Sequence, residues 1–327
     1  MSAPATPLID VATLAAQLDA PRLRLFDASV ELPAPRFDGD YRPASGADGW
    51  RQAHIPGARH ADLLHALSDP QAGFGFALPE RAALLAALQR LGIGDGCLPV
   101  LYDRSDGFWA ARLWWMLRSV GIDAQVLDGG WRAWRGAGLP SASGEPATPA
   151  SASASAMLTA APRPAAWVDR RYIEAVLAGD AAGTLVCALS APLFAGRAPS
   201  RYARRGHIPG SRNLPARALF DAAGHYLPPA QLARILAPLQ AAARPLLLYC
   251  GGGISAAAVG LALSLLGETA VAVYDGSLQE WAADPALPLV ALANVSSASE
   301  RASDADAGAA MPRATDGSPT DAAEPRR

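Results

Sequence analysis

The chain repeats itself, and this repeat constrains its fold more than any other feature. HIPGAR at His54–Arg59 returns as HIPGSR at His207–Arg212. VLYD, ending at Asp103, returns as LLYC, ending at Cys250, 147 residues further on. VLDGGWRAW returns as VYDGSLQEW with the same offset, whereas the two HIPG motifs lie 153 residues apart. Two copies of one domain of about 130 residues explain these repeats, and the second copy has six residues fewer between its first two motifs.

Each copy alternates short apolar runs with helical patterns. In the second copy we predict strands at 184–187, 246–249 and 270–274, and helices at 229–239, 255–266 and, as a short turn, 278–283. Such alternation predicts an α/β fold in which each copy has a mainly parallel sheet flanked by helices. Sheets of this kind bind ligands at the carboxyl ends of their strands, and Cys250 lies at such an end.

Two segments of biased composition divide the chain. Residues 141–166 are rich in Ser, Ala and Pro, and residues 294–327 have no aromatic and few apolar residues besides alanine. We expect the first to be a flexible linker and the second a disordered tail, because neither can bury a core. The predicted domains are therefore 1–140 and 167–293.

Composition narrows the class of protein. Of the 327 residues 51% are hydrophobic, which suffices for a sizeable core, and the net charge of −2 gives no reason to expect a nucleic-acid partner. Three cysteines are too few for a disulfide framework. The start of the chain lacks the pattern of a signal peptide, and the most apolar run, 256–266, is shorter than the roughly 20 residues that cross a bilayer. We therefore expect a cytoplasmic protein without a membrane partner.

Cys250 is the candidate nucleophile. It ends an apolar run, and three glycines follow it before a helical pattern begins. Glycines let successive amide N–H groups turn toward one point, and the start of a helix adds a partial positive charge. A cysteine in such surroundings is stabilised as a thiolate, which is a nucleophile. Cys97 and Cys187 lack such a loop and are predicted to be buried structural cysteines.

Two classes of phosphate-binding site, the nucleotide-binding P-loop and the cysteine phosphatase loop, also place a loop before a helix. The sequence lacks the residues that each of them needs. A nucleotide-binding P-loop needs Lys and then Ser or Thr after its glycines, and this pair is missing. A cysteine phosphatase needs an arginine at the far rim of the loop, where Ser255 and Ala256 stand instead. The corresponding loop of the first copy, DRSDGFW from Asp103, lacks such a run of glycines and is predicted not to form an anion-binding cradle.

Five motifs stand in a characteristic order: HIPGARH, YD…LWWMLRSVGIDAQVLDGGWRAW, GHIPGSRNLP, YCGGGISAA and YDGSLQEW. With them the chain resembles the tandem-domain sulfurtransferases of the rhodanese family over about Leu8–Leu292. The resemblance implies two tandem rhodanese-like domains, of which the first is inactive, with Asp103 at the nucleophile position. It also implies that Cys250 takes a sulfane sulfur from a small anionic donor as a persulfide and passes it to a thiol or cyanide acceptor. No cofactor or metal is implied.

The resemblance also points to the groups that bind sulfur. We expect the backbone N–H groups of the loop to hold it, with a hydrogen bond from the Ser255 hydroxyl; the loop residues are Gly251, Gly252, Gly253, Ile254 and Ser255. The sequence CGGGISA resembles the CGSGVTA loop of mercaptopyruvate-type enzymes and, unlike thiosulfate-type loops, carries no basic side chain. We therefore expect 3-mercaptopyruvate to be favoured over thiosulfate as the donor.

Three departures from the family pattern concern substrate recognition. Gly252 stands where mercaptopyruvate enzymes usually have serine. In the run CALSAPLF, Cys187 replaces an aspartate, and Leu189 and Leu193 replace arginines. Family members use the second of these arginines on the carboxylate of the donor, so the donor of this chain needs another cation.

An arginine cluster just beyond these leucines offers that cation; its members are Arg197, Arg201, Arg204, Arg205 and Arg212. Arg197 and Arg201 are the predicted donor-binding residues, because a small anion needs a fixed cation. His54 of the first HIPG motif is a further candidate, since the family places that histidine near the cleft between the domains. It either moves a proton or positions the donor, or it is structural, as we expect of His207.

A second hypothesis is that both copies have lost turnover and that the chain is a binding or persulfide-carrier module. The changes at Leu189, Leu193 and Gly252 favour it, whereas the intact loop at Cys250 favours an enzyme. Turnover with small donors separates the two.

Overall fold

The computed structural model describes residues 6–145, here called the first half, and 166–291, the second half. Residues 146–165 of the predicted linker and the whole predicted tail at 294–327 lie outside the described residues. The described parts of both halves belong to one compact unit.

Each half contains a five-stranded sheet in which every neighbouring pair of strands is parallel. The strands of the first sheet, in spatial order, are β1 (Leu8–Ile9), β7 (Gln125–Leu127), β6 (Leu98–Tyr102), β2 (Leu23–Asp27) and β5 (Arg59–His60). Those of the second, in the matching order, are β8 (Trp167–Val168), β12 (Val271–Tyr274), β11 (Leu246–Tyr249), β9 (Thr184–Cys187) and β10 (Arg212–Asn213). The identical order confirms the repeat and the predicted α/β class.

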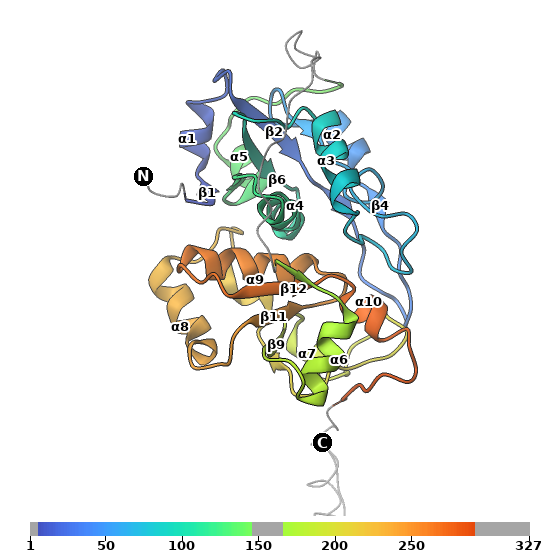
Figure 1. Cartoon of the computed structure of the whole chain (residues 1–327). Helices are drawn as coiled ribbons and strands as arrows, with labels where there is room; N and C mark the ends of the chain where they lie inside the picture. The colour runs from blue at the N-terminus through green and yellow to red at the C-terminus, as the bar shows by residue number, and fades with distance from the viewer. Residues whose placement is uncertain (1–5, 146–165, 292–327) are drawn as a thin grey trace, which may run out of the picture. The chain divides into compact units, whose positions relative to one another are not determined.

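Helices flank both sheets (Figure 1). In the first half they are α1 (Val11–Ala15), α2 (Ala47–Gln52), α3 (Arg81–Arg90), α4 (Phe108–Ser119) and α5 (Gly130–Gly136). In the second half they are α6 (Arg170–Ala178), α7 (Ala191–Phe194), the 3₁₀ helix η2 (Ala216–Leu219), α8 (Pro229–Gln240), α9 (Ile254–Leu265) and α10 (Ser277–Trp281). The first half also has a short antiparallel pair, β3 (Val30–Glu31) with β4 (Ala44–Ser45).

The two halves meet along α4 and α9. Eight of the twelve residues of α9 are buried, because the helix is largely apolar and lies between its own sheet and α4. Gly260 makes the close approach possible: a Cβ added there would lie 2.7 Å from Cζ3 of the Trp115 ring. A helix without a polar face is therefore explained by burial on both sides.

Polar contacts also tie the halves together near the ends of the second sheet. Arg112 of α4 is 1% exposed and donates to Asp275 Oδ1 at 2.6 Å and to the Phe76 carbonyl at 2.7 Å. Its guanidinium lies 4.4 Å from the centre of the Trp167 ring. The other carboxylate oxygen of Asp275 accepts from the Leu78 amide at 2.7 Å. The first copy is longer by six residues in the region that includes Phe76 and Leu78, so this longer segment supplies contacts between the halves.

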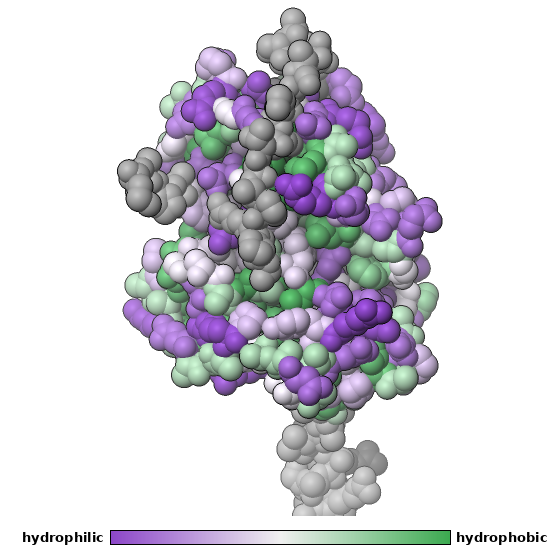
Figure 2. All heavy atoms as spheres, in the orientation of Figure 1, coloured by the Kyte–Doolittle hydropathy of each residue, from purple (hydrophilic) through white to green (hydrophobic). Residues whose placement is uncertain are grey.

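On the face seen in Figure 2, hydrophilic and hydrophobic residues of the described chain are interspersed. Among the helices of residues 6–145 and 166–291, none is both long and apolar enough to cross a membrane.

Candidate active site

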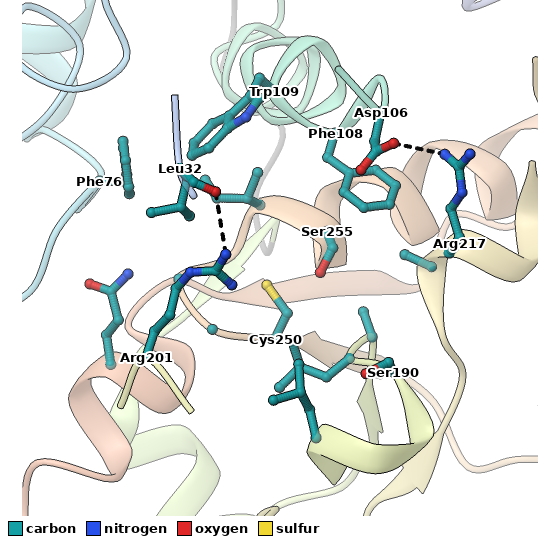
Figure 3. Close-up of a pocket in the computed structure, with 18 of the residues that line it drawn as sticks. Leu32, Phe76, Asp106, Phe108, Trp109, Ser190, Arg201, Arg217, Cys250 and Ser255 are labelled. Atoms are coloured by element: carbon teal, nitrogen blue, oxygen red, sulfur yellow. Dashed lines mark hydrogen bonds and ion pairs between the residues drawn. The ribbon is translucent and has the colours of Figure 1, made fainter. Parts of the chain in front are cut away.

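Cys250 follows directly on β11 and precedes α9, as the sequence predicts. Side chains alternate across the second sheet, so Tyr249 and Cys187 pack on one face while Cys250 belongs to the cluster on the other. The Cys250 side chain is buried and its sulfur points into a pocket (Figure 3). Cys187 therefore faces away from Cys250, although the two residues lie on neighbouring strands or just beyond.

The start of α10 forms hydrogen bonds with Cys250 and with the loop that follows it. Ser277 Oγ accepts the Cys250 amide at 3.2 Å, and the amides of Leu278 and Gln279 donate to the carbonyls of Cys250 and Gly251 at 3.1 and 2.8 Å. Ser277 adopts φ 47°, a strained value for a residue with a side chain, and is fully buried. The carbonyls of the loop are thus bound on the side of α10.

The amide N–H groups of the loop remain available on the other side. Within the described chain, the amides from Gly251 to Ser255 donate to no protein acceptor. Gly253 is the N-cap of α9, with φ 75°, so these amides stand where the helix dipole is positive. The arrangement is a site for a single negative charge next to a thiol.

At each of the three glycines an added Cβ would crowd the end of a different side chain. A Cβ at Gly251 would overlap the Tyr202 hydroxyl, and a Cβ at Gly252 would lie 2.5 Å from Gln279 Nε2. A Cβ at Gly253 would lie 2.6 Å from Nη1 of Arg112, which reaches the loop from the first half. Side chains therefore surround the loop closely. Gly253 also has a positive φ of 75°, which glycine adopts without strain.

The pocket at Cys250 has a volume of about 360 Å³ and draws its walls from both halves (Figure 3). Its apolar lining consists of Val30, Leu32, Phe76, Phe108, Trp109, Ala188, Leu189, Leu193, Pro215, Ala216 and Ile254. Its polar lining consists of Tyr41, Ser105, Asp106, Ser190, Arg201, Tyr202, Arg217, Ser255 and Gln279, besides Cys250, Gly251 and Gly252. The leucines that replace family arginines, Leu189 and Leu193, thus stand in the wall of the pocket.

Arg201 is the member of the predicted cluster that reaches the pocket. Its Nη2 donates to the carbonyls of Leu32 and Pro33 at 3.3 and 2.9 Å, which fixes the guanidinium against the first half. Its Nε is buried and has no hydrogen-bond partner among the described residues. Figure 3 shows the Arg201 and Cys250 side chains among those that line the pocket. A buried donor without an acceptor suits an anionic ligand.

The other predicted arginines have different places. Arg197 is exposed and does not line the pocket, so the expectation that it binds the donor has no support in the geometry. Arg204 donates to backbone carbonyls that include those of Ala282 and Leu287, and Arg205 pairs with Asp38 at 2.9 Å. Arg212 donates to the Pro238 carbonyl at 2.5 Å.

A second cation at the pocket was missed by the sequence analysis. Arg217 of η2 lines the pocket and pairs with Asp106 of the first half at 2.9 Å, with both side chains about half exposed. Nothing in the local sequence marks this pair, because the two residues belong to different copies and meet only when the halves pack.

His54 is buried in the first half and does not line the pocket. Its Nδ1 lies 2.9 Å from the Trp50 carbonyl, and its ring stacks on Trp50. His207 repeats this arrangement in the second half, with Nδ1 2.8 Å from the Phe194 carbonyl and its ring stacked on Phe194. The geometry favours the structural interpretation of His54, and we assign it no step in a reaction.

Asp103 holds the position of Cys250 in the first half, and its surroundings correct one expectation. Its carboxylate accepts from the amides of Ser105, Gly107 and Ala110 at 2.9, 3.0 and 3.0 Å. The loop therefore does form an anion-binding cradle, although it lacks the run of glycines, and the prediction that it would not is wrong. Burial raises the pKa of the Asp103 carboxyl, and the three amide donors oppose that rise.

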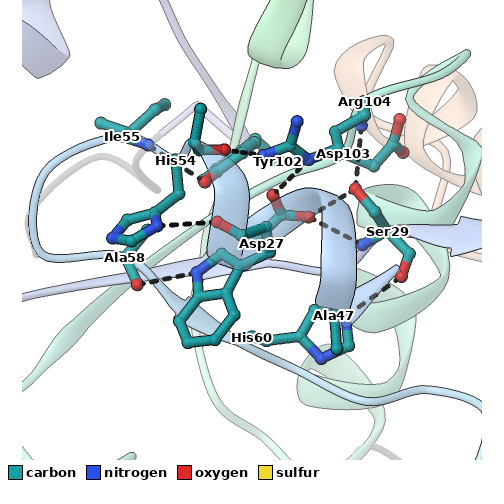
Figure 4. Close-up of polar contacts among 12 residues, drawn as sticks. Asp27, Ser29, Ala47, His54, Ile55, Ala58, His60, Tyr102, Asp103 and Arg104 are labelled. Atoms are coloured by element: carbon teal, nitrogen blue, oxygen red, sulfur yellow. Dashed lines mark hydrogen bonds and ion pairs between the residues drawn. The ribbon is translucent and has the colours of Figure 1, made fainter. Parts of the chain in front are cut away.

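Figure 4 shows the polar network beside this loop. Asp27, at the end of β2, accepts from the Ser29 amide at 3.0 Å and from Arg104 Nε at 3.1 Å. Polar groups at the end of β2 and just beyond β6 therefore form hydrogen bonds within the first half.

The remaining cysteines lie outside the pocket. Burial raises the pKa of the Cys187 thiol to about 12, which keeps it protonated at neutral pH. Cys97 is partly buried, and its sulfur accepts from the Gly94 amide at 3.4 Å. In the described parts of the chain, no group of three or more His, Cys, Asp or Glu side chains could hold a metal ion.

Comparison with known proteins agrees with this geometry. A family model described as the rhodanese-like domain matches residues 10–137 and 188–284. The probable 3-mercaptopyruvate sulfurtransferase of Pseudomonas aeruginosa is 34% identical over 290 residues, which cover 86% of this chain and 97% of the relative. The mitochondrial thiosulfate/3-mercaptopyruvate sulfurtransferase 1 of Arabidopsis thaliana is 33% identical, with coverage of 86% and 78%.

A solved structure shows the same fold. The crystal structure of SseA from Escherichia coli, described as having the rhodanese fold and the mechanism of 3-mercaptopyruvate sulfotransferases, superposes with a TM-score of 0.68 at 28% identity. The superposition covers 83% of this chain and 98% of SseA.

Proposed function

Because the chain belongs to the rhodanese family, we propose that it is a sulfurtransferase that moves a sulfane sulfur from a small anionic donor to a thiophilic acceptor through a persulfide on Cys250. The observation that carries this proposal is the buried Cys250 thiol beside a row of amide N–H groups that have no acceptor within the described chain. The curated relatives named above are sulfurtransferases, which supports the reaction class.

In the first step, the Cys250 thiolate attacks the sulfur of the donor. With 3-mercaptopyruvate the carbon–sulfur bond breaks, its electron pair stays with carbon as the enolate of pyruvate, and a proton taken up there completes the product. The transferred sulfur stays on Cys250 as a persulfide. Amides from Gly251 to Ser255 stabilise its negative charge, and the Ser255 hydroxyl, which lines the pocket, adds a further donor.

In the second step, a thiolate or cyanide attacks the outer sulfur of the persulfide. The sulfur–sulfur bond breaks, its electron pair returns to Cys250 Sγ, and the acceptor leaves as a persulfide or as thiocyanate. No net oxidation occurs over the two steps, so no cofactor is needed by this chemistry.

The charges of the pocket support mercaptopyruvate over thiosulfate. Arg217 is paired with Asp106, while no carboxylate of the described chain forms an ion pair with Arg201. Apart from the Cys250 thiolate, whose charge the loop amides stabilise, the charged side chains of the lining thus carry one positive charge in excess. One carboxylate matches this better than the two charges of thiosulfate.

The proposal also assigns the catalytic domain to 167–293 and an inactive domain to 1–140, and it keeps the cytoplasmic location expected from the sequence. The boundaries agree with the two sheets, each of which is complete within one of these ranges.

A second candidate function is supported by Leu189 and Leu193 in the wall of the pocket. If their apolar side chains exclude every small donor, the chain is a rhodanese-fold carrier of persulfide with little turnover.

The test is a donor screen at fixed cyanide or dithiol concentration. We expect turnover with both donors and a higher kcat/KM for 3-mercaptopyruvate. A higher kcat/KM for thiosulfate would overturn the donor preference, and loading of Cys250 without turnover of any donor would favour the carrier.

A further inference from the structure

We propose that Tyr41 is a catalytic residue of the first step, and that its hydroxyl gives the proton that turns the departing enolate into pyruvate. This inference rests on the proposed function, because it names the source of a proton that the reaction of 3-mercaptopyruvate at Cys250 requires. It follows from a chain of hydrogen bonds that fixes the Tyr41 hydroxyl near the loop after Cys250 and leaves its hydrogen available.

Gln279 connects Tyr41 to this loop. Its backbone amide donates to the Gly251 carbonyl at 2.8 Å, and its side-chain Nε2 donates to Tyr41 Oη at 2.9 Å. The same Nε2 would lie 2.5 Å from a Cβ added at Gly252. One nitrogen atom thus contacts both the loop and the Tyr41 hydroxyl. Tyr41 belongs to the first half and lines the same pocket as Cys250, so the packing of the halves brings this hydroxyl to the site.

The Gly75 amide fixes the direction of the hydrogen bonds in this chain. A backbone N–H can only donate, so the Gln279 atom 2.8 Å from Gly75 N is the carbonyl oxygen, Oε1. The other end of that side chain is therefore the NH₂ group, and Tyr41 Oη accepts from it. The hydroxyl hydrogen of Tyr41 takes no part in this bond, and no acceptor among residues 6–145 and 166–291 receives it. A ligand in the pocket can accept it.

The other proton-bearing side chains of the pocket are poorer acids. The described lining contains no histidine, and the guanidinium of Arg201 does not lose its proton in proteins. Serine hydroxyls are not among the side chains that titrate in proteins. Burial raises the pKa of Tyr41 to about 12 and that of Tyr202 further. Apart from the nucleophile itself, Tyr41 is therefore the best neutral acid in the wall, and it holds its proton at neutral pH.

The charges that act on Tyr41 are those expected beside a reacting donor. The positive charge of Arg201 lowers the pKa of Tyr41 and a thiolate at Cys250 raises it, so both charges lie within electrostatic reach of the hydroxyl. Arg201 suits the carboxylate of 3-mercaptopyruvate, and the loop amides suit its sulfur. The methylene carbon is bonded to that sulfur, so a donor bound at both ends has this carbon beside the loop, where Tyr41 is held.

The step balances with this acid. The Cys250 thiolate attacks the sulfur of 3-mercaptopyruvate, a sulfur–sulfur bond forms and the carbon–sulfur bond breaks. The electron pair on the methylene carbon takes the proton of Tyr41 Oη, which gives the methyl group of pyruvate and leaves a tyrosinate. The thiol hydrogen of the donor stays on the outer sulfur, and its release when the persulfide ionises restores the proton of Tyr41. The thiolate sulfur is oxidised to the persulfide level while the carbon is reduced to a methyl group.

The experiment measures the two half-reactions separately in the parent and in Tyr41→Phe, which keeps the ring and loses the hydroxyl. Loading is followed as pyruvate formed in one turnover of 3-mercaptopyruvate. Discharge is followed as thiocyanate, formed when the loaded protein is freed of donor and mixed with cyanide; it needs no proton on carbon. We expect the limiting rate of loading to fall about hundredfold, the lower end of what a positioned acid contributes, and the rate of discharge to stay within about threefold.

Two further variants separate the hydroxyl from the packing around it. Gln279→Leu removes the donor to Tyr41 but keeps the Tyr41 hydroxyl, so loading should fall far less than in Tyr41→Phe. Tyr172→Phe removes a hydroxyl that donates to the Ala182 carbonyl outside the pocket, so both rates should match the parent. Equal falls of loading and discharge in Tyr41→Phe would show a structural role instead. That result, or a loading rate within about threefold of the parent, would overturn the inference.

Failure of this inference differs from failure of the proposed function. If 3-mercaptopyruvate loads Cys250 in the parent and loads Tyr41→Phe equally fast, only the proton donor is wrong. If 3-mercaptopyruvate puts no sulfur on Cys250 of the parent, the proposed reaction of this donor falls and the role of Tyr41 falls with it.

Discussion

The loops after β6 and β11 stand at the same place in two copies of one fold, yet one is closed and the other is open. In the first half, the Asp103 carboxylate accepts three amides of its own loop and helix start. In the second half, the amides from Gly251 to Ser255 have no acceptor within the described chain, and the thiol of Cys250 lies beside them. The fold supplies an anion site in both halves, and the side chain at one position decides whether it is filled from within.

The length of the loop differs as well. Gly107 caps α4 four positions after Asp103, and Gly253 caps α9 three positions after Cys250, with φ values of 78° and 75°. The longer first loop wraps around its carboxylate. The shorter second loop consists of glycine alone, and Arg112 reaches Gly253 from the other half. A side chain of the first half, which has the closed loop, thus packs against the open loop of the second half.

Replacement of the Cys250 thiol in the open loop should have the largest effect on activity. Cys250→Ser keeps the size of the side chain and removes the nucleophile, so we expect sulfur transfer to be lost entirely with any donor. The measurement is turnover beside an unfolding curve that matches the parent. Activity within tenfold of the parent would contradict the role of the open loop.

The second largest effect is expected from removal of the Arg112 side chain, which lies beside Gly253. Arg112→Met leaves Asp275 without its buried partner, which typically costs about 3–5 kcal/mol of stability. We expect a large fall in the free energy of unfolding, measured by denaturant titration. Asp275→Asn is the companion variant, since it leaves Arg112 unpaired from the other side. A loss below about 1 kcal/mol in both would show that this contact does not hold the halves together.

The cation beside the open loop should affect donor binding. Arg201→Met removes a hydrogen-bond donor to a charged ligand, which is worth about 1.5–3 kcal/mol, or roughly a tenfold to hundredfold change. We expect KM for 3-mercaptopyruvate to rise more than kcat falls. Arg197→Met is the matched control from the same cluster, because Arg197 lies outside the pocket. Equal effects of the two variants would remove Arg201 from the site.

The smallest effect on activity is expected at the closed loop. Asp103→Asn replaces one carboxylate oxygen by an NH₂ group, which cannot accept from the loop amides, so the free energy of unfolding should fall by about 1–3 kcal/mol while turnover stays within a few-fold of the parent. Unfolding and kcat/KM are measured on the same preparation. A loss of several hundredfold in kcat/KM with unchanged stability would show that the first copy takes part in catalysis.

Local patterns predicted the three central strands of the second sheet and three helices of the second copy. The strands at 184–187 and 246–249 were predicted with their observed bounds, and that at 270–274 begins one residue later. The predicted helix at 255–266 begins and ends one residue earlier. Apolar runs and helical periodicity depend on neighbours in sequence, which explains this agreement.

The parts of the site that sequence patterns missed depend on packing between the copies. Leu32, Tyr41 and Phe76 reach the Cys250 pocket only because the first half lies against the second. The Asp103 cradle was missed because backbone amides form it, and these carry no sequence signal. The sequence left His54 open between a catalytic and a structural role, and its contacts with Trp50 favour the structural one.

The most direct test of the central claim is to locate the transferred sulfur. The protein is treated with 3-mercaptopyruvate without acceptor, persulfides are capped by alkylation, and the peptides that hold Cys97, Cys187 and Cys250 are separated by mass spectrometry. We predict one added sulfur atom, on the Cys250 peptide alone, and its loss when cyanide is added. Added sulfur on Cys97 or Cys187, with none on Cys250, would contradict the account.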